Sequence, residues 1–215
     1  MNKTILLLVL ITSSCTSFNQ YYDIFTNDST DAKLSLINKM KKSPYASIIV
    51  KDKTSSFSIT LDSISIQGTI WATSSNEYYL MNSGKVFETA GLNNDFKLSL
   101  KKDVNKIFNI FCDKYSLGKN YIIEGNIYFS NPATNPMKYI SELHAVRIEN
   151  IISIFNGTTK QTILIKEDVS IPKIKFDVTN YYWINLERCQ TMRSIQHLNP
   201  LDDKVSFEVM KYHKQ

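Results

Sequence analysis

The sequence predicts an all-β fold, an antiparallel meander forming a barrel- or sandwich-like body with one short helix near its N-terminus. Three observations lead to this prediction. Apolar and polar residues alternate over many short segments, which is typical of strands with one buried face. Turn signals separate these segments at short spacing. Helical patterns that would connect parallel strands are missing between them, so antiparallel pairing is favoured.

The N-terminal part of the folded body is expected to be helical. A cap at Ser29 or Thr30 and the stop provided by Pro44 predict a helix through about Lys42. Strand patterns follow directly. The phase of their alternation changes near residues 62–63, which predicts a bulge or bend at that point.

Two turns predict hairpins between later strands. Asn82-Ser83-Gly84 separates two apolar segments, and Asn156-Gly157 is a strong two-residue hairpin signal. The alternation continues to a last strand that is expected to end near Met210. The pattern therefore predicts about ten or more strands.

The segment of residues 103–115 fits two structures. Val104, Ile107, Phe108 and Phe111 have helical spacing. The segment is nevertheless rich in Val, Ile, Phe, Asn and Cys, which are weak helix formers. On this ground we expect a strand from about Ile107.

The first residues form a targeting signal. A basic start and the apolar run 5–11 predict a lipoprotein signal peptide over residues 1–14, with Cys15 as the acylated residue. The alternative is an ordinary signal peptide in which Cys15 is incidental. Residues 15–28 then form a lipidated tether, and residues 29–215 a single antiparallel β domain. Thr16, in place of Asp, favours the outer membrane over the inner membrane.

The composition excludes several classes of function. The net charge of +5 is spread thinly, and no run of Lys or Arg exceeds two, so we expect no nucleic-acid partner. Three histidines and three cysteines leave little for a metal site, and we predict neither a metal nor another cofactor. Cys112 and Cys189 either form a disulfide in an oxidising compartment or stay unpaired as small buried residues.

No constellation of residues predicts catalysis. His144 and Glu142 share a strand face, but the sequence shows no third partner for them. The nucleophile motif G-x-S-x-G is absent. In the pair Tyr181-Tyr182 one ring is expected on each sheet face, where the outer ring either packs across strands or stacks on a sugar. We therefore expect a protein that is not an enzyme.

Four segments carry a family resemblance: Ser43 to Ser47, Trp71 to Leu92, Tyr182 to Asn185, and Met192 to Ser194. Together with the lipoprotein signal, they resemble the group 4 capsule polysaccharide lipoprotein family, GfcB/YjbF. Asn185 stands where this family tends to have Asp. The resemblance implies an all-β outer-membrane lipoprotein encoded with machinery for capsule or exopolysaccharide secretion, without a catalytic activity. The motif residues expected to have structural roles are Pro44, Tyr45, Trp71, Gly84, Gly91, Tyr182 and Trp183.

Some of these residues have a specific physical role. Tyr45 and Trp71 are expected to be packing anchors, each with a polar group that finds a partner. Gly91 follows a strand where a turn with positive φ is expected.

The function that we expect is that of a non-enzymatic accessory factor in capsule or exopolysaccharide assembly or export. Its partners would be the outer membrane, through the lipid anchor, and polysaccharide or polysaccharide-export proteins. One alternative is a periplasmic lipid or lipoprotein carrier, whose half-open barrel would have an apolar lumen. A further alternative is a periplasmic glycan hydrolase, which would place two carboxylates across a groove.

Overall fold

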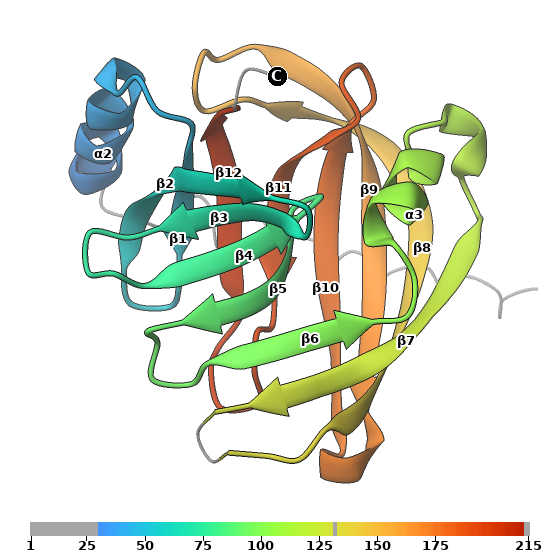
Figure 1. Ribbon diagram of the computed structural model, residues 1–215. Coiled ribbons are helices and arrows are strands. Elements are labelled where there is room, and N and C mark those ends of the chain that lie inside the picture. Colours follow the sequence, from blue (N-terminus) through green and yellow to red (C-terminus); the bar gives the residue numbers. More distant parts are fainter. Residues whose placement is uncertain (1–29, 131–132, 213–215) are drawn as a thin grey trace, which may run out of the picture. The chain divides into compact units, whose positions relative to one another are not determined.

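The computed structural model describes residues 30–130 and 133–212 (Figure 1). The chain divides into two compact units, residues 1–35 and 36–215, and of the first unit only the beginning of one helix is described. The signal peptide, Cys15 and the tether lie outside the described residues. The domain boundary near residue 28 stays a prediction. In the described part of the chain, no helix is both long and apolar enough to cross a bilayer.

Helix α2 spans Thr30–Lys42, which confirms the predicted helix, and Pro44 lies just beyond its end. Twelve strands follow in the described residues: β1 (Ser47–Lys51), β2 (Ser56–Ser65), β3 (Gly68–Ala72), β4 (Tyr78–Asn82), β5 (Lys85–Ala90), β6 (Phe96–Leu100), β7 (Asn120–Phe129), β8 (Met137–Ile152), β9 (Thr159–Ile171), β10 (Phe176–Asn185), β11 (Gln190–Gln196) and β12 (Val205–Lys211). The other helical segments are α3 (Val104–Phe111), η1 (Lys114–Ser116) and η2 (Pro172–Ile174).

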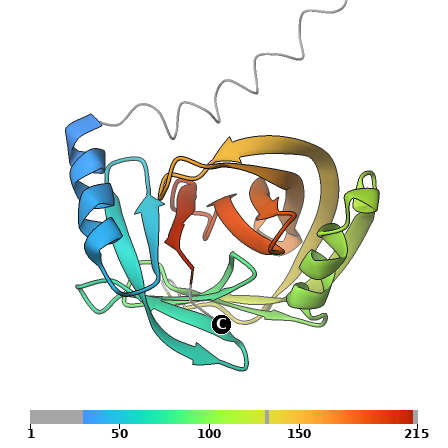
Figure 2. The same cartoon turned by 90° about the horizontal axis from the view of Figure 1, so that it is seen from above.

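The strands form one closed antiparallel barrel in which sequence neighbours pair and β12 pairs with β1. Figure 2 shows the strands arranged around a common centre. The predicted all-β antiparallel fold is confirmed, with a barrel rather than a sandwich. The register of β2 with β3 shifts between Leu61 and Ser63, where the sequence predicts a bulge. Both predicted hairpins are present, as β4–β5 and β8–β9.

The strand expected from Ile107 is wrong, because the segment forms helix α3. Asp103 caps this helix through a hydrogen bond from the Asn105 N–H to its side chain, at 2.9 Å. Val104, Phe108 and Phe111 are all buried. Burial of an apolar face at helical spacing outweighs the weak intrinsic propensity of these residues, since most helical stability in proteins comes from such packing.

The barrel interior contains two apolar clusters. One joins helix α3 to inward residues of β7, β8, β9 and β10, among them Ile123, Leu143 and Ile165. The other fills the rest of the barrel and includes Val169 and Phe207. The two clusters together form a core that α3 completes at one end.

The second half of α2 packs on the outside of the barrel. Ile37 and Met40 lie in a small apolar cluster with Ile49 of β1 and Met210 of β12. This contact fixes the end of the helix, from Leu36 on, to the strand pair that closes the barrel.

Candidate functional site

A layer of polar side chains separates the two apolar clusters of the barrel. Along β9, Glu167 is flanked by inward residues of both clusters, Ile165 on one side and Val169 on the other. Its register partners on the neighbouring strands are Leu143 and Asn180. Glu167 is 0% exposed and Asn180 3%. A full negative charge therefore lies in the middle of the barrel.

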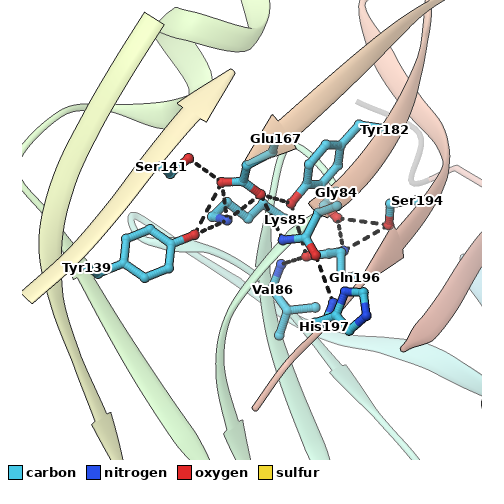
Figure 3. Close-up of polar contacts among 11 residues, drawn as sticks. Gly84, Lys85, Val86, Tyr139, Ser141, Glu167, Tyr182, Ser194, Gln196 and His197 are labelled. Carbon is cyan, nitrogen blue, oxygen red and sulfur yellow. Dashed lines mark hydrogen bonds and ion pairs between the residues drawn. The ribbon is translucent and has the colours of Figure 1, made fainter. Parts of the chain in front are cut away.

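The counter-charge comes from β5. The Lys85 ammonium lies 2.7 Å from Oε1 and 2.9 Å from Oε2 of Glu167, and it also donates to the Tyr139 hydroxyl at 2.9 Å (Figure 3). Lys85 itself is only 3% exposed. Two unit charges placed this deeply are tolerated only when they are paired and hydrogen-bonded.

The carboxylate of Glu167 accepts further hydrogen bonds, so its lone pairs are well satisfied. Ser141 donates to Oε1 at 2.5 Å, while Tyr182 and Asn180 donate to Oε2 at 2.7 and 3.0 Å. These donors come from β8 and β10. The arrangement is a complete polar network, in which a charge-assisted bond holds each side of the carboxylate.

The network determines the protonation of its members. Burial alone raises the pKa of Glu167. The Lys85 ammonium and the hydrogen bonds lower it by more than burial raises it, and the resulting pKa is about 2. Burial and the nearby Glu167 charge raise the pKa values of Tyr139 and Tyr182 well above the usual range. At neutral pH the carboxylate is therefore ionised and both phenols are protonated donors.

A second set of bonds attaches the β4–β5 hairpin to β11. Gln196 donates to the Gly84 carbonyl at 2.8 Å and accepts from the Val86 N–H at 3.0 Å. A Cβ on Gly84 would lie 2.5 Å from the side chain of Thr191, and φ at Gly84 is +80°. Glycine is therefore required at this turn both for its backbone conformation and for the close approach to β11. This contact places Lys85 in the polar layer.

The space left inside the barrel is small. A cavity of about 20 Å³ borders Lys85, Tyr139, Asn180, Gln196 and His197. A volume of this size holds about one water molecule. In the described residues, the barrel centre is thus occupied by side chains and not by a ligand-sized lumen.

A larger hollow lies on the outer face of β8, β9 and β10. Its volume is about 360 Å³, near the lower end of the roughly 300–1,000 Å³ found for ligand pockets. We call it the outer groove. Its lining residues are Ile140, Glu142, Asp168, Val169, Ser170, Asp177, Val178 and Thr179. Val169 and Val178 pair with each other and pack on the barrel core, so the outward side chains of the groove are carboxylates and hydroxyls with Ile140.

Strand register brings the polar residues of the outer groove together. Glu142, Asp168 and Thr179 are paired across β8, β9 and β10. Asp168 accepts from Lys166 and from Thr179, each at 2.7 Å. Burial raises the pKa of Asp168, but these bonds outweigh it, so the net pKa is lowered. Asp168 is therefore an ionised acceptor, and it lacks the raised pKa of a general acid.

The structure supplies the third partner that the sequence did not reveal for His144. Its Nε2 lies 3.7 Å from Glu142 Oε1 and 3.8 Å from Asp168 Oδ2. The imidazole is thus placed between two carboxylates at the edge of the outer groove. Among the described residues, no group of three or more His, Cys, Asp or Glu side chains is arranged to hold a metal ion.

The aromatic motif residues divide into buried and exposed ones. Trp71, Trp183 and Tyr182 are buried, with exposures of 7%, 8% and 0%. Trp71 donates its Nε1–H to Thr69 at 2.8 Å, which agrees with the expected packing anchor. The same expectation is wrong for Tyr45, which is 63% exposed. Pro44 beside it is also exposed, because the chain here crosses from α2 to β1 over the surface.

The remaining predicted residues lie in turns. Gly91 has the expected positive φ of 89°, and Asp95 accepts hydrogen bonds from the Gly91 and Leu92 N–H groups at 2.9 and 3.1 Å. Asn185 Oδ1 accepts from the Arg188 N–H at 2.9 Å and so stabilises the β10–β11 turn.

Cys112 and Cys189 are joined in the structure as a disulfide with a Cα–Cα distance of 5.4 Å. Cys112 follows α3, and Cys189 precedes β11. The bridge therefore attaches the helix at the end of the barrel interior to the β10–β11 turn.

The Lys85–Glu167 pair is not evident from the sequence alone. The signal for one partner was present, since Glu167 occupies the inward phase of Ile163, Ile165, Val169 and Ile171. A charged residue in an apolar phase requires a buried partner. Nothing local identifies that partner as Lys85, which is 82 residues away.

Comparisons with known proteins agree with the fold. The model of a family described as group 4 capsule polysaccharide lipoprotein, GfcB or YjbF, matches residues 22–210. The crystal structure of the hypothetical lipoprotein YmcC from Escherichia coli has a TM-score of 0.67 at 13% identity, covering 95% of this chain and 100% of that one. This similarity shows a common fold.

Two further structures are more distant. An exported protein from Bacteroides fragilis with a YmcC-like fold has a TM-score of 0.38 at 11% identity, covering 80% of this chain and 97% of its own. A lipoprotein from Parabacteroides distasonis has a TM-score of 0.33 at 13% identity, covering 79% and 95%. None of the curated proteins matches the sequence significantly.

Proposed function

The chain belongs to the group 4 capsule polysaccharide lipoprotein family, and we propose that it is a non-enzymatic accessory lipoprotein of the outer membrane. It assists the assembly or export of a surface polysaccharide by binding glycan or a protein of the secretion machinery. Acyl chains on Cys15 hold it on the periplasmic side of that membrane. Two acyl chains suffice for stable anchoring.

The main support for this proposal is that side chains fill the interior of the barrel. A carrier of lipids or lipoproteins needs an apolar lumen, whereas this barrel has an ion pair at its centre and space for about one water. Binding is therefore assigned to the outer surface. This favours an accessory binding protein over the carrier that the sequence left as an alternative.

The outer groove is the surface that best fits a glycan. Its carboxylates and hydroxyls accept and donate hydrogen bonds to sugar hydroxyls, while Ile140 offers apolar contact to the C–H face of a sugar. The lowered pKa of Asp168 supports binding over hydrolysis, because a glycosidase needs a carboxylic acid that is still protonated.

A genetic experiment tests the proposal. The gene is deleted, surface polysaccharide is quantified, and the strain is complemented with the wild-type chain or with Cys15→Ser. We expect the deletion to lower surface polysaccharide, the wild-type chain to restore it, and the Ser variant to fail. Normal polysaccharide in the deletion strain contradicts the accessory role. Full restoration by Cys15→Ser contradicts the need for the anchor.

A further inference from the structure

One segment of the chain is strongly basic. Five lysines and no acidic residue lie between residues 33 and 51, so this segment alone has a charge equal to the net +5 of the whole chain. Lys39, Lys41 and Lys42 fall in the last turn of α2 and are exposed. The part of the chain that enters the barrel therefore carries a clear net positive charge.

Contacts within the second unit fix these lysines on one surface. Ile37 and Met40 bury the inner side of α2 against β1 and β12. The Lys211 ammonium donates to the carbonyls of Ser43 and Pro44 at 3.1 and 3.4 Å, which holds the α2–β1 turn and adds a further cation. The helix end is thus a positioned part of the surface.

An exposed aromatic ring lies in the same turn. Tyr45 is 63% exposed, although it belongs to a family motif, and its ring is amphipathic. We call Lys39, Lys41, Lys42, Tyr45 and Lys211 the basic corner. Asp62 is the carboxylate on the neighbouring strand, because it follows Leu61, whose N–H donates to the Ala46 carbonyl at 3.0 Å. The four lysines of the corner outnumber this one carboxylate, so the corner has a net positive charge.

We propose that the basic corner lies on the anionic lipid headgroups of the membrane to which the chain is anchored. Lysines beside a bilayer are attracted by anionic headgroups, and tyrosine rings sit at the headgroup level. Fourteen residues separate Cys15 from Thr30, where α2 begins. Their greatest reach is about 50 Å. This step rests on the proposed anchoring: the 13 residues of α2 add at most about 20 Å, so a lipidated Cys15 keeps the corner within about 70 Å of the bilayer.

The surface orients the barrel. When the basic corner contacts the headgroups, the strand pair β1–β12 lies beside the membrane, because the corner is built on it. Electrostatic attachment of this kind depends on salt and on lipid charge. A second attachment also adds to the effect of the acyl chains.

Vesicle binding of the Cys15→Ser chain tests the inference without a contribution from acyl chains. We expect it to bind vesicles of phosphatidylethanolamine with phosphatidylglycerol and not vesicles of phosphatidylcholine. Each lysine contributes about fivefold to partitioning. The added substitutions Lys39→Gln, Lys41→Gln and Lys42→Gln should therefore weaken binding on the order of a hundredfold.

A matched control removes the same charge elsewhere, with Lys102→Gln, Lys119→Gln and Lys173→Gln, all exposed residues outside the corner. Equal loss of binding in both triple variants overturns the inference, as does equal binding to both vesicle types. Binding of the corner to an acidic polysaccharide such as alginate, without binding to vesicles, also overturns it. If vesicle binding fails while gene deletion still lowers surface polysaccharide, only this inference falls and the proposed function stands.

Discussion

Lys85 and Glu167 form a buried ion pair across the barrel, with Nζ 2.7 Å from Oε1 and side chains that are 4% and 0% exposed. Their strands, β5 and β9, are not neighbours in the barrel. The pair therefore connects two distant parts of the wall through the centre. Because the other hydrogen bonds to the carboxylate come from two further strands, β8 and β10, the pair also helps to define how the barrel closes.

Breaking this pair on one side should destabilise the protein strongly. Glu167→Gln leaves the Lys85 ammonium buried without a counter-charge, which typically costs about 3–5 kcal/mol. We expect a loss of that size in urea unfolding. The double variant Lys85→Met/Glu167→Gln removes both charges and should lose clearly less than the sum of the single variants. Additive losses would show that the two side chains are not coupled.

The same pair predicts how stability depends on pH. The pKa of Glu167 is about 2 in the folded protein against a reference value of 4.5. Because the folded value is the lower one, the unfolded chain takes up the proton first as the pH falls. The ionised Glu167 carboxylate thus stabilises the folded protein by an amount on the order of 3 kcal/mol. This contribution is complete above about pH 4.5 and is lost as the pH falls from about 4.5 to about 2.

Urea unfolding at a series of pH values measures this dependence. The variant Lys85→Met/Glu167→Gln serves as the control, since it lacks the titrating group and should show a flatter profile in the same pH window. Identical profiles for the variant and the wild-type chain would contradict the prediction.

The barrel was predictable from the sequence because its signals are local. Alternation of apolar residues, the Asn-Gly turn and the phase change near residue 62 each arise within a few residues of chain, and the structure contains all three. The α3 segment was mispredicted for a different reason. Its residues have weak helix propensity, and the packing of Phe108 and Phe111 against the barrel strands decides its structure.

The polar layer and the outer groove were not predictable in this way. Lys85 meets Glu167 only because the barrel closes, and the two are 82 residues apart. Likewise, His144 and Asp168 come together through the pairing of β8 with β9, where Asp168 lies two residues beyond Lys166, the register partner of His144. Single-sequence patterns give the face of a residue but not its partner on another strand.

The bridge between Cys112 and Cys189 should contribute to stability. It closes a loop with a sequence separation of 77, for which removal costs about 2–5 kcal/mol. We expect Cys112→Ala/Cys189→Ala to lower the free energy of unfolding by about that amount and therefore to lower the melting temperature. Dithiothreitol should lower that of the wild-type chain similarly and leave the double variant unchanged. Two free thiols in the wild-type chain, denatured under non-reducing conditions, would contradict the bridge.

The outer groove makes the proposed glycan contact testable at the level of single residues. Glu142 and Asp177 line the groove on β8 and β10. Replacing either by its amide, as Glu142→Gln or Asp177→Asn, removes the negative charge of an acceptor while keeping the shape of the side chain. A hydrogen bond to a charged group is worth about 1.5–3 kcal/mol, so each change should weaken binding by about tenfold or more.

Binding can be measured with polysaccharide extracted from the surface of the producing strain, by calorimetry on the purified chain. Glu187→Gln is the matched control, since it removes the same charge from a carboxylate that is 70% exposed and lies outside the groove. The melting temperatures of all three variants should stay close to that of the wild-type chain, because surface substitutions usually change stability by about 0.5 kcal/mol or less. If the groove variants bind the polysaccharide as tightly as the control does, the glycan contact lies on another surface of the barrel.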